Sequence, residues 1–375
     1  MCIRDSADIV QWEAQQRPPV AAPQPAAAQR WSLDYALMAA QRARPDLLAR
    51  PGQNAPERAE LRLAQADLAL QVERAWLRAV AAGSSARYQA QVLQAAQAGA
   101  ELAARLVRVG NWPQMRLLQE QLLLNQAQAQ QRVAQHQQHL AMLDLWRLAG
   151  SGLTPRQLEQ QLPTDWPTVS APAANTARAA MATPATSPAT PAFAPLAVLE
   201  VQALQAHPRW PLLQRQAQIL ERGLSPAERE GLAAALAAAV APQPDTGAAS
   251  PLPELTARQL WPGTWDKAAE ARAEADALER QIRADVHSAY SAWQTATELA
   301  EGSAQDALRL HTALQDETQQ RYNGMLKSTW ELLASASARV QAAEAALLAR
   351  RDAAVATAEL RAVLAGLSYE TAKGD

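Results

Sequence analysis

The chain repeats itself, and this repetition constrains its fold more than any other feature. A shift of 214 residues places Val72 on Val286 and Gly110 on Gly324 with no gap between them. Apart from one polar position, Gln89 on Ser303, apolar and small residues recur in both copies at steps of four and three, which is the spacing of a left-handed coiled-coil seam. The aligned seam positions are Leu68, Val72, Ala75, Ala79, Ala82, Ala86, Leu93, Ala96 and Ala100 on Ile282, Val286, Ala289, Trp293, Ala296, Ala300, Ala307, Leu310 and Leu314.

Each copy is expected to be a long hairpin that turns at a glycine. Helical patterns run from about Pro56 to Arg108 and on to Gly150, and the second pair runs from about Asp266 to Gly366. We expect the turn glycines, Gly110 and Gly324, to take the left-handed conformation that ends a helix. After the second turn, Ser328 and Glu331 have the spacing of a capping box.

A short helix precedes each hairpin and ends at a related motif. Arg44-Pro45 closes the first, and His207-Pro208 closes the second. The predicted organisation is a disordered leader over 1–30 with six non-native residues at its start, a first helical repeat over 31–150, a Pro/Ala/Thr-rich linker over 151–196, a second repeat over 197–366 with an irregular insert at 226–264, and a tail over 367–375.

Composition supports a helical protein and excludes several function classes. Alanine makes up about a quarter of the chain and aromatic residues only 5%, which disfavours β-sandwich and doubly wound α/β folds. The net charge of −2 does not indicate a nucleic-acid partner. A single cysteine, Cys2, excludes an internal disulfide and a Cys-based zinc site. No apolar stretch is long enough to span a bilayer as a helix.

The sequence contains no recognisable catalytic constellation. It lacks a phosphate-binding glycine loop, a metalloprotease motif and a nucleophile elbow. His136 and His139 could share a helix face, but without a nearby carboxylate or cysteine they are weak metal ligands. We therefore predict no enzyme activity, no cofactor and no metal.

The second hairpin turn resembles the signature of a known family. The matching residues are Arg321-Tyr322-Asn323-Gly324-Met325-Leu326-Lys327-Ser328-Thr329-Trp330-Glu331-Leu332-Leu333, with a weaker copy from Arg108-Val109-Gly110 to Leu117-Leu118. Together with the duplicated hairpins, this segment resembles the TolC family of outer-membrane efflux proteins. The resemblance covers roughly residues 31–150 and 197–366.

The resemblance implies an assembly and a docking site. Proteins of this family are homotrimers in which long helices form a periplasmic tunnel below an outer-membrane β-barrel. Their hairpin tips contact a periplasmic adaptor protein, which links the channel to an inner-membrane pump. By this resemblance the adaptor-facing residues are Gly110, Asn111, Trp112, Asn323, Gly324, Ser328 and Trp330. For charged residues near the tips, such as Arg116, Arg321 and Lys327, a solvent-exposed helix face is a simpler interpretation than a role in closing the channel.

The sequence leaves little room for membrane strands. A transmembrane strand needs about 10 residues, and the first repeat offers only Leu47 to about Glu60 between its helices. The second repeat is longer there, but Leu232 to Trp265 carries five prolines and few β-branched residues. We therefore expect an all-α chain of duplicated coiled-coil hairpins whose β-barrel segments are reduced or absent.

Three functions remain open at this level. The leading interpretation is a passive outer-membrane channel of a tripartite efflux or type I secretion system in a Gram-negative bacterium. The second is a periplasmic coiled-coil structural or interaction protein without its own pore. A membrane-fusion-type adaptor is a third, although no β-rich segments of the kind it needs are visible. Oligomer size separates the first two, because a tunnel built from these hairpins must be trimeric.

Overall fold

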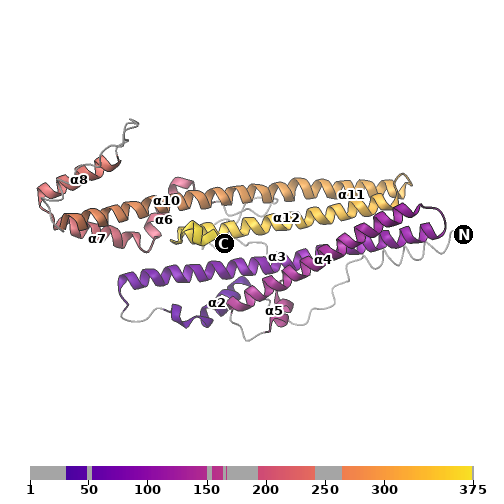
Figure 1. Ribbon diagram of the computed structural model, residues 1–375, viewed down its shortest axis with the longest axis horizontal. Coiled ribbons are helices and arrows are strands. Elements are labelled where there is room, and N and C mark those ends of the chain that lie inside the picture. Colours follow the sequence, from indigo (N-terminus) through magenta and orange to yellow (C-terminus); the bar gives the residue numbers. More distant parts are fainter. Residues whose placement is uncertain are drawn as a thin grey trace, which may run out of the picture.

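The described part of the chain is entirely helical in its regular structure. The structure is a computed structural model that describes residues 31–48, 53–149, 154–163, 166, 193–240 and 264–373. Within these ranges every regular element is a helix and none is a strand. Two long hairpins lie side by side, and their turns are at the same end of the molecule (Figure 1). The expected all-α fold of duplicated hairpins is confirmed. The predicted leader (1–30), most of the linker (167–192) and two stretches considered for strands (49–52 and 241–263) lie outside the described residues.

The first repeat begins with short elements and continues into one very long helix. Its elements are α2 (Leu33–Ala43), the 3-10 turn η1 (Pro45–Leu47), α3 (Ala55–Arg108) and α4 (Gln114–Ala149). Asn54 starts α3 because its side chain accepts the Glu57 N–H, while the Glu57 carboxylate accepts the Asn54 N–H. The 54 residues of α3 span about 80 Å. α2 stops at Ala43, directly before the Arg44-Pro45 motif, as the sequence predicts.

A further helix, α5 (Pro155–Gln161), forms inside the stretch assigned to the linker. Thr154 caps it in a reciprocal pair with Gln157, and Pro155 occupies the first turn. Leu158 is fully buried, and the Gln161 carbonyl accepts the Trp31 N–H at 2.8 Å. This short helix therefore closes the base of the first repeat.

The second repeat repeats this plan with more elements. They are α6 (Leu196–Ala206), α7 (Trp210–Arg222), α8 (Pro226–Val240), α10 (Thr264–Gly302), the π-helical turn η2 (Ser303–Ala307), α11 (Leu308–Asn323), α12 (Thr329–Leu364) and α13 (Tyr369–Lys373). α8 occupies the first part of the segment expected to be irregular, where alanine and leucine are strong helix formers. No helix in the described ranges combines the length and apolarity needed to cross a bilayer.

The π turn η2 changes the register between the two copies. Up to Ala300 the predicted seam holds, since Ile282, Val286 and Ala289 are buried like their partners in α3. Beyond η2 the predicted seam positions Leu310 and Leu314 are 61% and 55% exposed, so that part of the prediction is wrong. The less exposed residues Leu308, His311 and Gln315 are each one position later than a predicted seam residue, and the buried Thr318 continues this face. A π turn accommodates one extra residue in a helix, so the offset between the copies becomes 215 beyond it.

A buried ion pair joins the two repeats. Arg74 of α3 and Glu359 of α12 form a salt bridge, and their side chains are only 9% and 12% exposed. Burial raises the pKa of Glu359, and the attraction of Arg74 opposes this effect. Desolvation therefore outweighs the attraction of Arg74 in setting the pKa of Glu359, and a buried pair of this kind is weak evidence for stabilisation.

The base of the second repeat is held by His207. The buried imidazole accepts N–H bonds at Nδ1 from Arg209 (3.2 Å) and Trp210 (3.1 Å), which satisfies the start of α7. Burial, and then the charge of Arg209, lower the pKa of His207, while a hydrogen bond to the Gly366 backbone raises it. Gly366 has φ +107°, and a Cβ there would lie 2.6 Å from Pro208 Cδ. Only glycine therefore lets the end of α12 approach this corner so closely.

Candidate functional site at the hairpin tips

The first tip closes at Gly110, as predicted. Gly110 has φ +78°, in the left-handed region. Its N–H donates to the Val107 carbonyl at 3.0 Å, and the Asn111 N–H donates to the Leu106 carbonyl at 2.9 Å. These two bonds form a Schellman motif that satisfies the last carbonyls of α3. A Cβ at Gly110 would meet no atom within 4 Å, so the backbone conformation alone favours glycine.

The second tip closes one residue later than predicted. Gly324 has φ −81°, and the left-handed residue is Met325 with φ +60°. The expectation that Gly324 adopts the left-handed conformation is therefore wrong. The same Schellman bonds form around Met325, because its N–H donates to Tyr322 at 2.9 Å and the Leu326 N–H donates to Arg321 at 2.8 Å. The extra residue accommodated at η2 accounts for this displacement, since Met325 is 215 positions beyond Gly110.

Ser328 begins the return helix of the second hairpin, as its sequence spacing predicts. Its Oγ accepts the Glu331 N–H at 3.3 Å, and the Glu331 carboxylate accepts the Ser328 N–H at 2.9 Å. Lys327 also donates to Glu331. The hydrogen bond from Lys327, followed by the one from the Ser328 backbone, lowers the pKa of Glu331 to about 2. The start of α12 is therefore held by an acid that stays ionised in ordinary buffers.

The two tips are joined by a pair of tryptophans. The rings of Trp112 and Trp330 have centroids 4.0 Å apart and planes inclined by 33°. The guanidinium carbon of Arg116 lies 5.6 Å from the centre of the Trp112 ring. Trp330 Nε1 is buried and has no hydrogen-bond partner among the described residues. The structure thus brings together two predicted site residues that are far apart in sequence.

Beyond the tryptophans, the tips present an apolar surface that sequence reasoning did not anticipate. Met325 is 94% exposed and Leu326 is 77% exposed, and Val109 and Met115 are also exposed at the first tip. Asn111, Asn323 and Gly324 are exposed beside them. Of the nearby charged residues, Arg321 pairs with Glu317 and Lys327 with Glu331 on the tip surface. Solvent-exposed methionine and leucine at a turn are the kind of patch that marks a protein contact.

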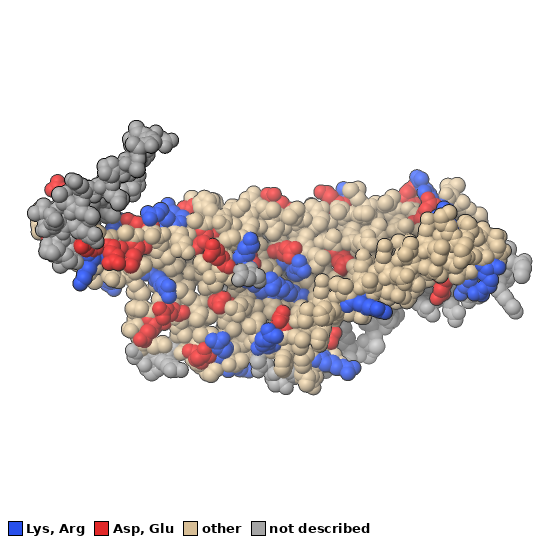
Figure 2. Space-filling view, in the orientation of Figure 1, with Lys and Arg blue, Asp and Glu red and all other residues tan. Residues whose placement is uncertain are grey.

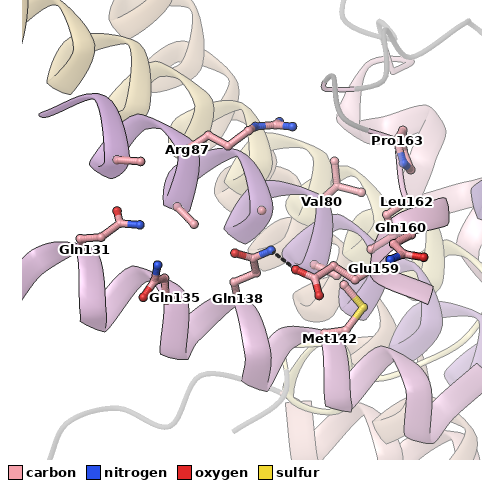
Figure 3. A pocket seen from close by; sticks show the side chains of 14 residues that line it. Val80, Arg87, Gln131, Gln135, Gln138, Met142, Glu159, Gln160, Leu162 and Pro163 are labelled. Atoms are coloured by element: carbon pink, nitrogen blue, oxygen red, sulfur yellow. Dashed lines mark hydrogen bonds between the residues drawn. The ribbon is translucent and has the colours of Figure 1, made fainter. Parts of the chain in front are cut away.

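A separate hollow lies between α3 and α4, away from the tips. It is a cavity of about 400 Å³, and Figure 3 shows Gln131, Gln135 and Gln138 of α4 on one of its sides. Gln138 donates to Glu159 of α5 at 2.6 Å. Amide groups opposite small apolar side chains can bind polar solutes, but they offer no nucleophile or paired acid and base. This hollow contains none of the predicted tip residues.

The histidine pair considered for a metal lies elsewhere on the surface. His136 and His139 are both exposed on α4. Among the described residues, no group of three or more His, Cys, Asp or Glu is arranged to hold a metal ion.

Comparison with known proteins identifies the fold. No protein-family model matches this chain, and no curated protein is significantly similar to it in sequence. Solved structures do match it. The CusC channel is 13% identical with a TM-score of 0.54, over 90% of this chain and 93% of CusC. The outer membrane protein VceC of Vibrio cholerae is 13% identical with a TM-score of 0.51, over 91% of this chain and 77% of VceC. The MtrE outer membrane channel of Neisseria gonorrhoeae, in its open state, is 16% identical with a TM-score of 0.50, over 90% of this chain and 72% of MtrE.

These matches agree with the resemblance drawn from the second tip. MtrE is an outer membrane channel, CusC forms a transmembrane channel, and VceC is an outer membrane protein. The chain has the fold of TolC-like outer-membrane channels, so the resemblance is confirmed at the level of the fold. At these sequence identities the similarity shows the fold alone. The role of the tip residues is proposed below.

Proposed function

We propose that this chain is the outer-membrane channel component of a tripartite efflux or type I secretion system. In this role it is a homotrimer in the outer membrane and periplasm, a passive conduit with no chemistry of its own. It docks a periplasmic adaptor protein through its hairpin tips, and the adaptor couples it to an inner-membrane pump. The contact residues at the tips are Gly110, Asn111, Trp112, Asn323, Gly324, Ser328 and Trp330, to which we add the exposed Met325 and Leu326.

The observation that carries the proposal is the apolar surface at the end of two rigid hairpins. Met325 and Leu326 are 94% and 77% exposed to solvent, which is unfavourable unless a partner covers them. The Trp112–Trp330 stack and the Ser328–Glu331 cap hold this surface on a defined frame. A preorganised apolar patch binds a partner at a low cost in conformational entropy.

A crosslinking experiment tests the docking role. The full chain is expressed in a Gram-negative host with a photoreactive amino acid at position 325, and the matched control carries it at Leu140. Leu140 is also an exposed apolar residue, but it lies far along α4 from the tips. We expect the position 325 variant to crosslink to a periplasmic protein with adaptor-type helical hairpins, and the Leu140 variant not to. Equal crosslinking at both positions, or none at 325, contradicts docking through the tips.

Oligomer size and conductance test the channel role. The purified full chain is expected to be trimeric by native mass spectrometry in detergent and to conduct ions in planar bilayers. A monomer or dimer without conductance contradicts the proposal. That result favours the alternative, a periplasmic coiled-coil protein with this fold and no pore of its own.

A further inference from the structure

A second cavity, midway along the molecule, is lined with cationic side chains. It has a volume of about 380 Å³ and lies between α3, α4 and the end of α13. Its polar lining consists of Gln71, Arg74, Arg78, Asp144, Arg147 and Lys373. In Figure 2, several Lys and Arg side chains, with Asp and Glu side chains among them, lie in the middle of the face shown. This volume is in the range of pockets that hold small molecules, about 300–1,000 Å³.

The charges of this cavity do not balance. Four cations line it against one carboxylate, Asp144, which lies 3.7 Å from Arg147 with both side chains exposed. Arg74 is paired with Glu359, which lies outside the lining. Arg78 and Lys373 form no ion pair with a described residue, although both act electrostatically on Glu359. When Glu359 and Asp67, which accepts from Gln71 at 2.8 Å, are both counted, one positive charge remains in excess.

The burial and hydrogen bonding of Arg74 are a second observation that points to an anion. The residue is only 7% exposed, so more than nine-tenths of it is buried. Its Nη2 donates to Glu359, but its Nε is buried and has no hydrogen-bond partner among the described residues. A buried donor without an acceptor costs roughly 1–3 kcal/mol, more if it is charged. Arg74 also lines the cavity, so an anion held there lies beside this buried guanidinium.

The geometry points to an oxyanion site, and we propose that this cavity binds a phosphate group carried by a small molecule or a lipid. Guanidinium groups favour phosphate because their planar N–H donors match its oxygens in pairs. Gln71, Arg74 and Arg78 project from one face of α3, at the spacing of successive helical turns. Lys373 adds a point charge from the end of α13. The site is distant from the hairpin tips and does not rest on the channel function.

Binding of inorganic phosphate to the full chain provides the first test. Isothermal titration at low ionic strength compares the wild type with R78Q and K373Q, because both side chains are exposed and neither forms a described ion pair. R62Q is the matched control, since Arg62 is an exposed arginine on α3 that does not line the cavity. Arg74 is not substituted, because its removal would leave the buried carboxylate of Glu359 without an ion-pair partner and destabilise the fold. We expect saturable binding at one site per chain, weakened about tenfold in R78Q and in K373Q and unchanged in R62Q.

A second arm separates the two sources of the phosphate group. The same four proteins are sedimented with vesicles that contain phosphatidic acid, and with neutral vesicles as reference. Binding of free phosphate without vesicle binding assigns the site to a soluble phosphate compound. Vesicle binding that is lost in R78Q and K373Q assigns it to a lipid headgroup. The proposal is overturned if the wild type binds neither probe, or if the R62Q control weakens binding as much as the cavity variants.

Discussion

The two hairpins follow one plan and differ by a single residue. In the first, α3 is α-helical from Ala55 to Arg108 and closes at Gly110. In the second, the corresponding arm contains the π turn η2 and closes at Met325, with Gly324 one position before the left-handed residue. The hydrogen bonds at the two tips are nevertheless of the same kind. The comparison shows that this fold conserves the inward face of the arm and the closing motif, while the residues that occupy them shift along the sequence.

The largest effect is expected from single deletions at matched positions of the two arms. Deleting Ala90 from α3 rotates the residues up to the turn by about 100° around the helix axis, so Ala100 and Ala103 leave the core. We expect the free energy of unfolding to fall by more than about 4 kcal/mol. Deleting Ala304 removes the extra residue of η2 and leaves Leu308 and Thr318 facing inward, so we expect a change within about 1 kcal/mol.

Urea denaturation followed by circular dichroism measures both deletions. Ala90 and Ala304 are aligned at the offset of 214, so each variant serves as the control for the other. If the two deletions destabilise the chain equally, η2 is not an accommodated extra residue and the comparison fails.

The next effect concerns the left-handed position at each tip. Gly110→Ala forces an alanine into φ +78° and should lower the free energy of unfolding by about 1–2 kcal/mol. Gly324→Ala should leave it unchanged or raise it by about 0.5 kcal/mol, because Gly324 has an ordinary φ and its added Cβ stays 3.6 Å from the nearest atom.

Met325→Gly tests the same assignment by placing a glycine at the left-handed position of the second tip. It relieves the strained φ of +60° at a cost in unfolded-state entropy, so we expect stabilisation by about 0.5–1 kcal/mol. Thermal and urea unfolding of the three variants give the ranking. A larger loss for Gly324→Ala than for Gly110→Ala contradicts the assignment of the left-handed residues.

The contact between the tips is tested by a double-mutant cycle. Trp112→Ala and Trp330→Ala each remove one ring of the stack, and the double variant removes both. We expect a coupling energy of about 0.5–1.5 kcal/mol, because stacked aromatic rings interact beyond their buried area. Trp112→Phe retains an aromatic ring and should keep part of this coupling. A coupling of zero means that the tips are held together by other contacts.

The smallest effect is a pH dependence confined to the second tip. The pKa of Glu331 is lowered from 4.5 to about 2, so the stabilisation by its ionised form is complete above about pH 4.5 and is lost as the pH falls through 2. The carboxyl resonance of Glu331 in an NMR titration reports this pKa directly. In Lys327→Gln the midpoint should rise, while the Ser328 N–H bond keeps it below the ordinary value. A midpoint near 4.5 in the wild type contradicts the Lys327–Glu331 interaction.

Much of this fold could be predicted from the sequence because its signals are local or periodic. The seam up to Ala300, the helix stops before Pro45 and Pro208, and the cap at Ser328 all follow from spacing within a few turns. The π turn could not be predicted in this way. Its residues, Ser303 to Ala307, are compatible with an ordinary α-helix, and the register change appears only when the packing of α11 is seen.

The candidate site was predictable in part for the same reason. The glycines and tryptophans beside the turns mark the tips, but the stacking of Trp112 on Trp330 depends on how the two hairpins are placed in space. The exposure of Met325 and Leu326 also escaped sequence reasoning, because apolar residues near a helix end ordinarily read as core. The only local indication of this exposure is the Gly-Met-Leu run after the helix, where either Gly324 or Met325 could adopt the left-handed conformation.

The contact of Gly366 with Pro208 also bears on how the chain assembles during synthesis. The corner between α6 and α7 is translated well before the end of α12, yet His207 needs Gly366 to complete its hydrogen bonds. Glu359 lies near the end of α12, so Arg74 has no ion-pair partner until this part of the chain has been synthesised. The corner of the second repeat and the contact between the two repeats therefore stay incomplete until nearly all of the described chain is available to fold. Shielding of these unfinished surfaces by chaperones is most needed in that interval.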